Sequence, residues 1–481
     1  MPGLSSGIQI ALQAVLTHSQ AIEIIEHNVA NATTVGYRRQ SAVLSASVPT
    51  PGYGMGIDTQ YGAGQRGTGV LMDRIQRFSS DFMDARYRAA ASESQDWSAR
   101  NTILTQLESL MAETSTSGLI PKMDQFWSGW QNLAANPSNN SLRTMLLNDA
   151  NSLTEAIRSR ALELTQIRVD HNKTLENQVT EINDIAGQIA KLNGEISHVQ
   201  AVDEQPNDLL DRRDLLIDRL SEIAGASSFI QPNGEAIVNI GGHVLVTGQD
   251  TIQLKVEVDP DPANTDRLYR VAWSDGQALV PTSGEMKGVL TIRDQTIKDQ
   301  MDGLDNLAKA LISQVNNLHM DPNGRDLNGN PGGEFFVTGG NATSIRVSSS
   351  LTEANIVAGG VDTTTGEEYD NFIADKIAAL KTTKVLIGTD VTATRTLNEF
   401  YNTQVTKLAT ETARASENSG HKNLLFTALD QQRESLSGVN LDEEAANLAK
   451  YQKAYQAAAR VMTAYDELLD TIINGMGLVG R

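Results

Sequence analysis

The stretch IQIALQAVLTHSQAIEIIEHNVANATTVGYRRQ, residues 8–40, combines a long apolar helix pattern with an abrupt end. Its large apolar side chains recur every seven residues, with one more that widens the stripe, so they line one edge of a helix. These positions are Ile8, Leu12, Val15, Ile22 and Val29. Because a lone helix with such an edge is marginal in water, the pattern predicts a helix that needs a partner.

The C-terminal region carries a matching stripe. Its members also follow one another at intervals of seven: Leu441, Leu448, Tyr455, Met462, Leu469 and Met476. We therefore expect long helices from both termini to pack as a coiled-coil-like bundle, either with each other or with copies from other subunits.

The end of the first helix is built from residues that stop helices. Residues 33–35 are β-branched and disfavour continuation, and Gly36 permits a left-handed conformation. Asn28 and Asn31 can bond backbone groups where the helix ends. Residues 37–39, Tyr-Arg-Arg, offer an aromatic ring and two charges to a neighbour. We expect this exit to set the angle between the terminal helix and an outer body.

Further helix patterns fill the middle of the chain. Heptad or three-and-four spacing runs through residues 175–199, 206–225, 297–318 and, with polar gaps, 397–429. Pro206 and Gly225 mark the start and end of the second of these. Residues 252–258 alternate apolar and polar side chains instead, and Asn-Gly and Gly-Gly pairs at 233–234 and 241–242 are typical of hairpins.

The sequence therefore predicts an elongated, mostly α, multi-domain protein with an inserted β domain. We expect a terminal helical domain from residues 1–50 plus 439–481 and a β-rich inserted domain at 226–290. A helical rod-like domain is expected from three further segments, 51–225, 291–319 and 370–438. Residues 320–369 are expected to be rich in loops, with short strands near 335–337 and 345–347.

Composition narrows the classes of partner. The formal net charge of −20 disfavours nucleic acid, whose phosphates would be repelled, and anionic membranes. The chain has no cysteine, hence no disulfide or thiolate site. It has no run of about 18 apolar residues and no basic stretch before an apolar one at its start. We therefore expect no membrane span and no cleaved signal peptide.

No set of residues indicates catalysis. Gly62, Gly64 and Gly67 spell G-x-G-x-x-G, but a Gly/Pro-rich loop precedes them where a dinucleotide site needs a strand. Residues 321–334 lack the glycine and glutamate spacing of a calcium loop. Asp211, Asp214 and Asp218 lie near three arginines, which favours a solvated helix face with local ion pairs. We expect no cofactor, no metal and no enzyme activity; an enzyme built from scattered carboxylates stays open.

The exit of the first helix also matches a known signature. The matching residues are Asn28, Asn31, Thr34, Gly36, Tyr37, Arg39 and Gln40. With Val29 and Ala30 they resemble the N-terminal motif of the bacterial flagellar axial proteins, which are the rod, hook and hook-associated proteins; Val35 replaces the usual proline. Residues 206–225, 304–319 and 437–474 also resemble this family, and the Arg39-Gln40 ending is most similar to its hook-associated members.

This resemblance implies a structural protein that polymerises at the hook tip and forms the junction between hook and filament. Implied partners are further copies in a ring, the hook protein, the next hook-associated junction protein, and a secretion chaperone at the C-terminal helix from Leu441 onward. Export through the flagellar type III apparatus to the extracellular flagellum is also implied. A hook or rod subunit, or an enzyme on an axial scaffold, are the alternatives. In the free monomer we expect residues 1–50 and 440–481 to be disordered or chaperone-bound.

Overall fold

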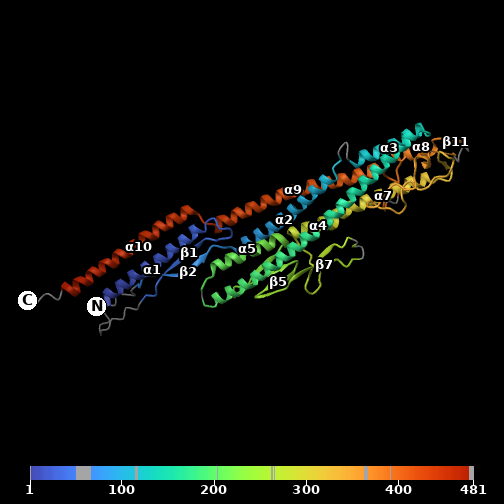
Figure 1. Cartoon of the computed structure of the whole chain (residues 1–481). Coiled ribbons are helices and arrows are strands. Elements are labelled where there is room, and N and C mark those ends of the chain that lie inside the picture. Colours follow the sequence, from blue (N-terminus) through green and yellow to red (C-terminus); the bar gives the residue numbers. More distant parts are fainter. Residues whose placement is uncertain are drawn as a thin grey trace, which may run out of the picture.

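Long helices run lengthwise through an elongated molecule (Figure 1). The computed structural model describes residues 2–49, 67–113, 118–202, 204–261, 264, 266–361, 367–389 and 392–475. Both terminal helices lie at one end of the molecule and the loop-rich segment lies at the other (Figure 1). The predicted fold class, mostly α with small inserted sheets, is confirmed.

The two terminal helices, α1 (Pro2–Ala30) and α10 (Leu441–Asp470), lie side by side and antiparallel (Figure 1). Tyr451 of α10 contacts His18 of α1, with ring centroids 6.0 Å apart. A two-stranded antiparallel hairpin, β1 (Gln40–Ala46) and β2 (Val70–Arg77), packs on α1. We call these four elements the terminal arm. Since an expected domain boundary at residue 50 would separate two paired strands, we propose that this domain extends to Arg77.

The rest of the described chain, which we call the body, is built around a bundle of helices, most of them long. They are α2 (Asp81–Leu110), α3 (Leu119–Ala135), α4 (Asn140–Gln200), α5 (Asn207–Ala224), α6 (Glu285–Thr291), α7 (Ile297–His319) and α9 (Leu397–Ser437). A π-helical turn, η1 (Ile292–Thr296), joins α6 to α7. A second such turn, η3 (Thr471–Gly475), continues α10 in the arm.

Local sequence accounts for several of these helix ends. Gly225 ends α5 in a left-handed conformation with φ of 66°, a conformation that costs glycine little. Thr396 and Glu399 form a reciprocal capping box at the start of α9. The predicted helices at 206–225 and 297–318 are confirmed within one or two residues. The helix predicted over 175–199 is the second half of the much longer α4.

Three of the largest buried side chains of the body belong to α3. Phe126, Trp127 and Trp130 are completely buried there. Trp130 packs against Phe335, with ring centroids 5.3 Å apart, and Phe126 packs against Phe336 at 5.9 Å. The aromatic side chains of one helix and one loop thereby fix the far end of the rod.

The β-rich insert contains two small antiparallel sheets. Four strands form the first: β3 (Ser227–Ile230), β4 (Ala236–Ile240), β5 (His243–Thr247) and β6 (Asp250–Thr251). The second pairs β7 (Leu254–Val258) with β8 (Tyr269–Trp273). Both predicted hairpin turns lie between paired strands, at 233–234 and 241–242. The predicted strand at 252–258 is shorter, because Ile252 lies between β6 and β7.

The distal end of the molecule is mostly loop. It contains a three-stranded sheet of β9 (Gly324–Arg325), β10 (Gly359–Val361) and β11 (Glu368–Tyr369), with the short helices η2 (Glu353–Asn355) and α8 (Phe372–Ala379). The strands expected at 335–337 and 345–347 are wrong in extent, since they form only an isolated bridge between Phe336 and Val347. None of the helices in the described residues is long and apolar enough to cross a membrane.

Candidate functional site: the joint between arm and body

The exit of α1 closes back on the helix through one buried asparagine. The Asn28 amide donates to the backbone oxygen of Gln40 at 2.8 Å, and the Gln40 N–H donates to Asn28 Oδ1 at 2.9 Å. The Tyr37 hydroxyl also donates to Asn28 Oδ1, at 2.8 Å. The Asn28 side chain thus bonds both the N–H and the C=O of Gln40, as a neighbouring strand would. It thereby joins the two ends of the loop at residues 31–39, which we call the exit loop.

The turn inside the exit loop depends on Gly36. Its φ is +81°, and a Cβ atom built there would lie 3.3 Å from Leu215 of α5. Asn31 donates to the His27 carbonyl one turn earlier at 3.0 Å and accepts from Thr34 Oγ1 at 3.2 Å. The prediction that asparagines bond backbone groups at this helix end is therefore confirmed.

Arg39 ties the exit loop to the point where α9 passes into α10. Its backbone N–H donates to the Ser437 carbonyl at 2.8 Å. Its guanidinium donates to Glu444 Oε1 and to Glu443 Oε2, both at 2.7 Å. Glu444 also accepts from Asn28 at 3.2 Å and is the one completely buried side chain of α10. The two terminal helices are therefore joined by hydrogen-bonded charge pairs where they leave the body.

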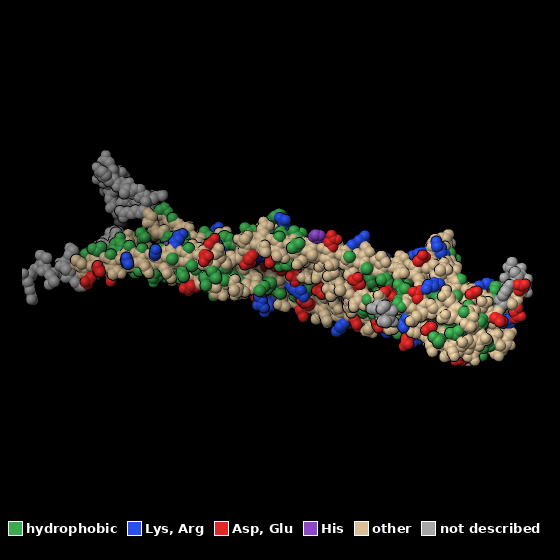
Figure 2. Space-filling view, turned by 90° about the horizontal axis from the view of Figure 1, so that it is seen from above, with side chains coloured by type: hydrophobic (Ala, Val, Ile, Leu, Met, Phe, Trp, Pro, Cys, Tyr) green, Lys and Arg blue, Asp and Glu red, His purple; other side chains and the backbone are tan. Residues whose placement is uncertain are grey.

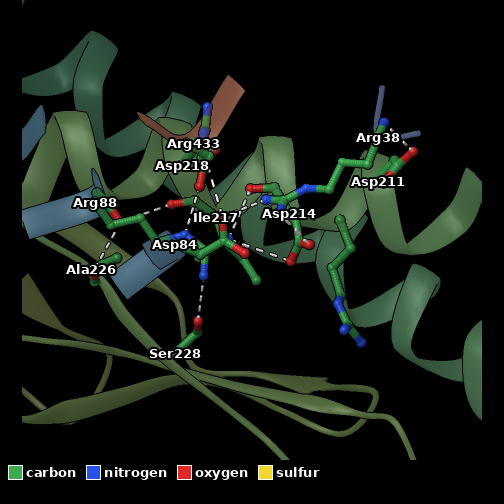
Figure 3. A network of polar contacts seen from close by, with 12 residues as sticks. Arg38, Asp84, Arg88, Asp211, Asp214, Ile217, Asp218, Ala226, Ser228 and Arg433 are labelled. Atoms are coloured by element: carbon green, nitrogen blue, oxygen red, sulfur yellow. Dashed lines mark hydrogen bonds and ion pairs between the residues drawn. The ribbon is translucent and has the colours of Figure 1, made fainter. Parts of the chain in front are cut away.

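Arg38 points the opposite way, into the body (Figure 3). Its guanidinium donates to Asp84 of α2 at 2.6 Å, and its backbone N–H donates to Asp211 of α5 at 2.9 Å. Arg77, at the end of β2, bridges Asp211 and Asp214, each at 2.6 Å. The exit loop and the hairpin of the arm are thus bound to the same face of α5.

A second pair of arginines completes this cluster from the body side (Figure 3). Arg88 of α2 and Arg433 of α9 both donate to Asp218, at 2.6 and 2.7 Å. Arg433 also lies over the Tyr87 ring, 3.3 Å from its centroid. We call the whole set the Arg–Asp network: Arg38, Arg77, Arg88 and Arg433 with Asp84, Asp211, Asp214 and Asp218.

Burial and neighbouring charges shift the pKa values of several groups in and beside the network. Burial alone would raise the pKa of Asp214, but Arg77, Arg88 and Arg38 hold that pKa below its ordinary value. For Asp211 burial prevails over Arg77, and the pKa is raised. Burial raises the pKa of Tyr87 to about 12. Four cations and four anions balance in this cluster, so it remains charged at neutral pH without a net charge.

One expectation about these residues is wrong. Asp211, Asp214 and Asp218 do not form a solvated face, because their partners are arginines from the exit loop, β2, α2 and α9. The arginines beside them in sequence turn away: Arg213 donates to the Gly234 carbonyl and Arg219 pairs with Glu181. The ring of Tyr37 and the charges of Arg38 and Arg39 bind groups of this same chain; their contact with a neighbour stays a prediction. The available signal for this cluster was the spacing of three and four residues between the aspartates, which places them on one helix face.

The predicted apolar stripes meet along the arm but are incompletely covered. Half-buried members are Ile8, Val15, Ile22, Leu448, Met462 and Leu469, and exposed members are Leu12, Val29, Leu441 and Tyr455. The completely buried side chains of α1 are mainly others, among them Ala11, Ala21 and Ile25. Met476 lies outside the described residues, as do Gly62 and Gly64. In Figure 2 the hydrophobic surface gathers on the arm.

The other motifs raised by the sequence carry no site in the described residues. No group of three or more His, Asp or Glu side chains there is placed to hold a metal ion. In the loop at 321–334, Asp326 accepts from the backbone N–H groups of Asn328 and Asn330, both at 2.8 Å, and so stabilises its own turn.

Comparisons with known proteins agree along the whole chain. Residues 104–336 match the flagellar hook-associated protein FlgK helical domain, and residues 430–475 match the flagellar basal body rod FlgEFG protein C-terminal family. Flagellar hook-associated protein 1 of Bacillus subtilis is 30% identical, covering 99% of both chains. Its namesake in Escherichia coli is 25% identical, covering 98% of this chain and 100% of that one.

A solved structure shares the fold. The flagellar hook junction protein FlgK from Burkholderia pseudomallei superposes with a TM-score of 0.63 at 18% identity. The match covers 74% of this chain and 100% of that chain.

Proposed function

This chain belongs to the family of flagellar hook-associated protein 1, structural proteins of the bacterial flagellum at the junction between hook and filament, and we propose that it builds the junction by docking its terminal arm against the arms of further copies. The full-length matches to hook-associated protein 1 favour this role over that of a hook or rod subunit.

One observation carries the proposal. Helix α10 is 30 residues long, yet its one completely buried side chain is Glu444. Large apolar side chains stay exposed on both arm helices, among them Leu12, Leu16, Val461 and Leu468. A helix pair gains most of its stability from burying such side chains, so an arm that leaves them in water is built to be covered by something else.

The joint determines where the arm can reach. Because Arg38 is bound to Asp84 of α2 and Arg77 to Asp211 of α5, while Arg39 is bound to α10, rotation of the arm against the body would break buried charge pairs. We propose that the exit loop fixes the angle between arm and body, so that copies with their arms packed together present their bodies in one orientation.

The remaining partners are proposed from the family to which the chain belongs. We propose that the ring of copies contacts the hook protein on one side and the next hook-associated junction protein on the other. Before assembly, the exposed α10 stripe would be covered by a secretion chaperone. We also propose export to the extracellular flagellum without a cleaved signal peptide, and no catalytic activity; purified protein should release no product from cell-wall fragments.

The experiment replaces four of these exposed apolar side chains by serine. The variant Leu12→Ser, Leu16→Ser, Val461→Ser, Leu468→Ser is expressed in a motile relative that lacks its own junction protein. We expect unchanged helix content of the purified chain, since these side chains are already exposed, but hooks without filaments in electron micrographs. The matched control is Val280→Ser, which changes a 73% exposed side chain of the β-rich insert. Normal filament attachment by the fourfold variant would overturn the proposal.

A further inference from the structure

The two helices of the arm carry exposed charged side chains. Glu23 and Glu26 on α1 and Lys453 on α10 are exposed, and the described residues give them no ion pair. Lys450 is exposed as well; its Nζ lies 5.5 Å from the ring centroid of the adjacent Tyr451, and it has no ion pair with any described residue. Opposite charges thus stand unpaired on two adjacent helices.

These charges extend the exposed apolar side chains into two stripes. On α1, Leu12, Leu16, Glu23 and Glu26 are separated by steps of four, seven and three residues, which places them on one helix face. On α10, the face is formed by Lys450, Lys453, Val461 and Leu468, at steps of three, eight and seven. Each stripe is apolar toward the free end of the arm and charged toward the joint, and the two charges are opposite.

The two stripes match only when one copy is displaced along the other. Within one chain Tyr451 lies level with His18, and Glu444 lies level with Asn28. Sliding α10 toward the joint by about five residues, roughly 8 Å at the rise of an α-helix, brings Lys450 level with Glu26. The same displacement brings Lys453 level with Glu23 and Val461 level with Leu16. One shift therefore aligns both ion pairs and the apolar contact.

We propose that the α1 stripe of one copy docks on the α10 stripe of the next copy, displaced by this one step along the arm, and that Glu23 and Glu26 pair with Lys453 and Lys450 across the contact. The inference rests on the proposed function and specifies its geometry. Different faces meet at this contact, so it is heterologous and propagates from copy to copy as a ring or helix requires. The apolar side chains supply most of the binding free energy, and the charges select the register.

Because the chain contains no cysteine, the register can be measured directly. Two singly substituted chains, Leu16→Cys and Val461→Cys, are co-expressed and the assembled junctions are mildly oxidised. We expect a disulfide-linked dimer of the two chains. In the control, Leu16→Cys is combined with Leu468→Cys, which lies about 10 Å further along the helix and should cross-link weakly. Equal cross-linking of both combinations, or none in assembled junctions, would overturn the proposed register.

Charge exchange provides the independent test. The variant Lys450→Glu, Lys453→Glu puts four like charges at the contact, so we expect about tenfold fewer filament-bearing hooks. Adding Glu23→Lys and Glu26→Lys restores the opposite signs and should restore attachment. If all charge variants assemble normally while the fourfold serine variant does not, the arms dock as proposed above but these ion pairs do not set the register.

Discussion

Helices α3 and α10 are both amphipathic, but they bury their apolar faces very differently. In α3 the side chains of Phe126, Trp127 and Trp130 are removed completely from water. In α10 the corresponding apolar stripe is half-buried at best, and the completely buried side chain is a glutamate. A periodic apolar stripe therefore predicts that a helix forms and needs a partner, but not whether that partner lies in the same chain. The body contains its own core, whereas the arm lacks part of one.

The largest effect should come from the body core. Trp130→Ala removes a completely buried ring that packs against Phe335 and His319, so we expect the free energy of unfolding of the body to fall by about 3–5 kcal/mol. Denaturant unfolding followed by circular dichroism measures the loss. The matched change on the arm, Val461→Ala, should cost less than about 0.5 kcal/mol in the free chain. Similar losses for both variants would remove the distinction between the two regions.

The next effect tests the joint between the two regions. Asp214→Ala deprives Arg77 of one of its carboxylates and leaves buried positive charge near Arg38 and Arg88, which should cost about 3 kcal/mol. The control Asp302→Ala breaks the exposed pair with Lys298 and should cost at most about 1 kcal/mol. Limited proteolysis should also separate the arm from the body sooner in the Asp214 variant than in the unchanged protein or the Asp302 control. A loss of body stability with no change in arm release would show that the network stabilises the body alone.

The joint contains some features that the sequence predicts and others that it cannot predict. The bounds of α5 and the signature of the exit loop were readable, because proline, glycine and asparagine act through local backbone chemistry. The packing of the two terminal helices followed from their matching stripes, with the choice between each other and further copies left open. The Arg–Asp network was not readable, because its arginines come from residues 38, 77, 88 and 433 and meet α5 only in three dimensions. A face of three aspartates looks the same in sequence whether water or arginine covers it.

Acid should loosen the distal end of the body. His319 is completely buried; its Nε2 accepts from the Val357 N–H at 3.0 Å, so its Nδ1–H donates to the Gly333 carbonyl at 2.7 Å. Burial, with Arg143 nearby, lowers the pKa of His319 to about 4. Since the unfolded chain binds this proton near pH 6.5, the stabilisation is complete above pH 6.5 and is lost as pH falls toward 4, by about 3 kcal/mol.

The measurement is the free energy of unfolding between pH 6.5 and 4. His319→Gln should flatten its decline, because the titrating group is gone. His421→Gln, at an exposed position of α9, should leave the decline unchanged. Equal slopes for all three proteins would mean that His319 does not carry this pH dependence.

A smaller effect is expected at the turn of the exit loop. Gly36→Val places a β-branched residue at φ of +81° with its Cβ 3.3 Å from Leu215, which should cost about 2 kcal/mol. Because the strain lies between arm and body, we expect filament attachment to fall more than the stability of the body. Gly187→Ala, within α4 and with no atom near the added methyl, should be neutral or stabilising. Normal secretion and assembly of the Gly36 variant would show that this turn does not set the arm angle.

The smallest effect concerns the seam of the arm itself. Met462 is a half-buried side chain of α10, the helix that packs on α1, so Met462→Ala should cost only about 1 kcal/mol and leave unfolding of the body unchanged. Amide hydrogen exchange, which reports local opening, should detect the change instead. In the free chain, the amide hydrogens of α1 and α10 are expected to exchange much faster than those of α3. In the Met462 variant they should exchange faster still. In assembled junctions the same amides should be protected, because neighbouring arms then cover the exposed stripes. Protection of the arm equal to that of α3 in the free chain would mean that the two terminal helices already form a complete core, and that assembly has little apolar surface left to bury.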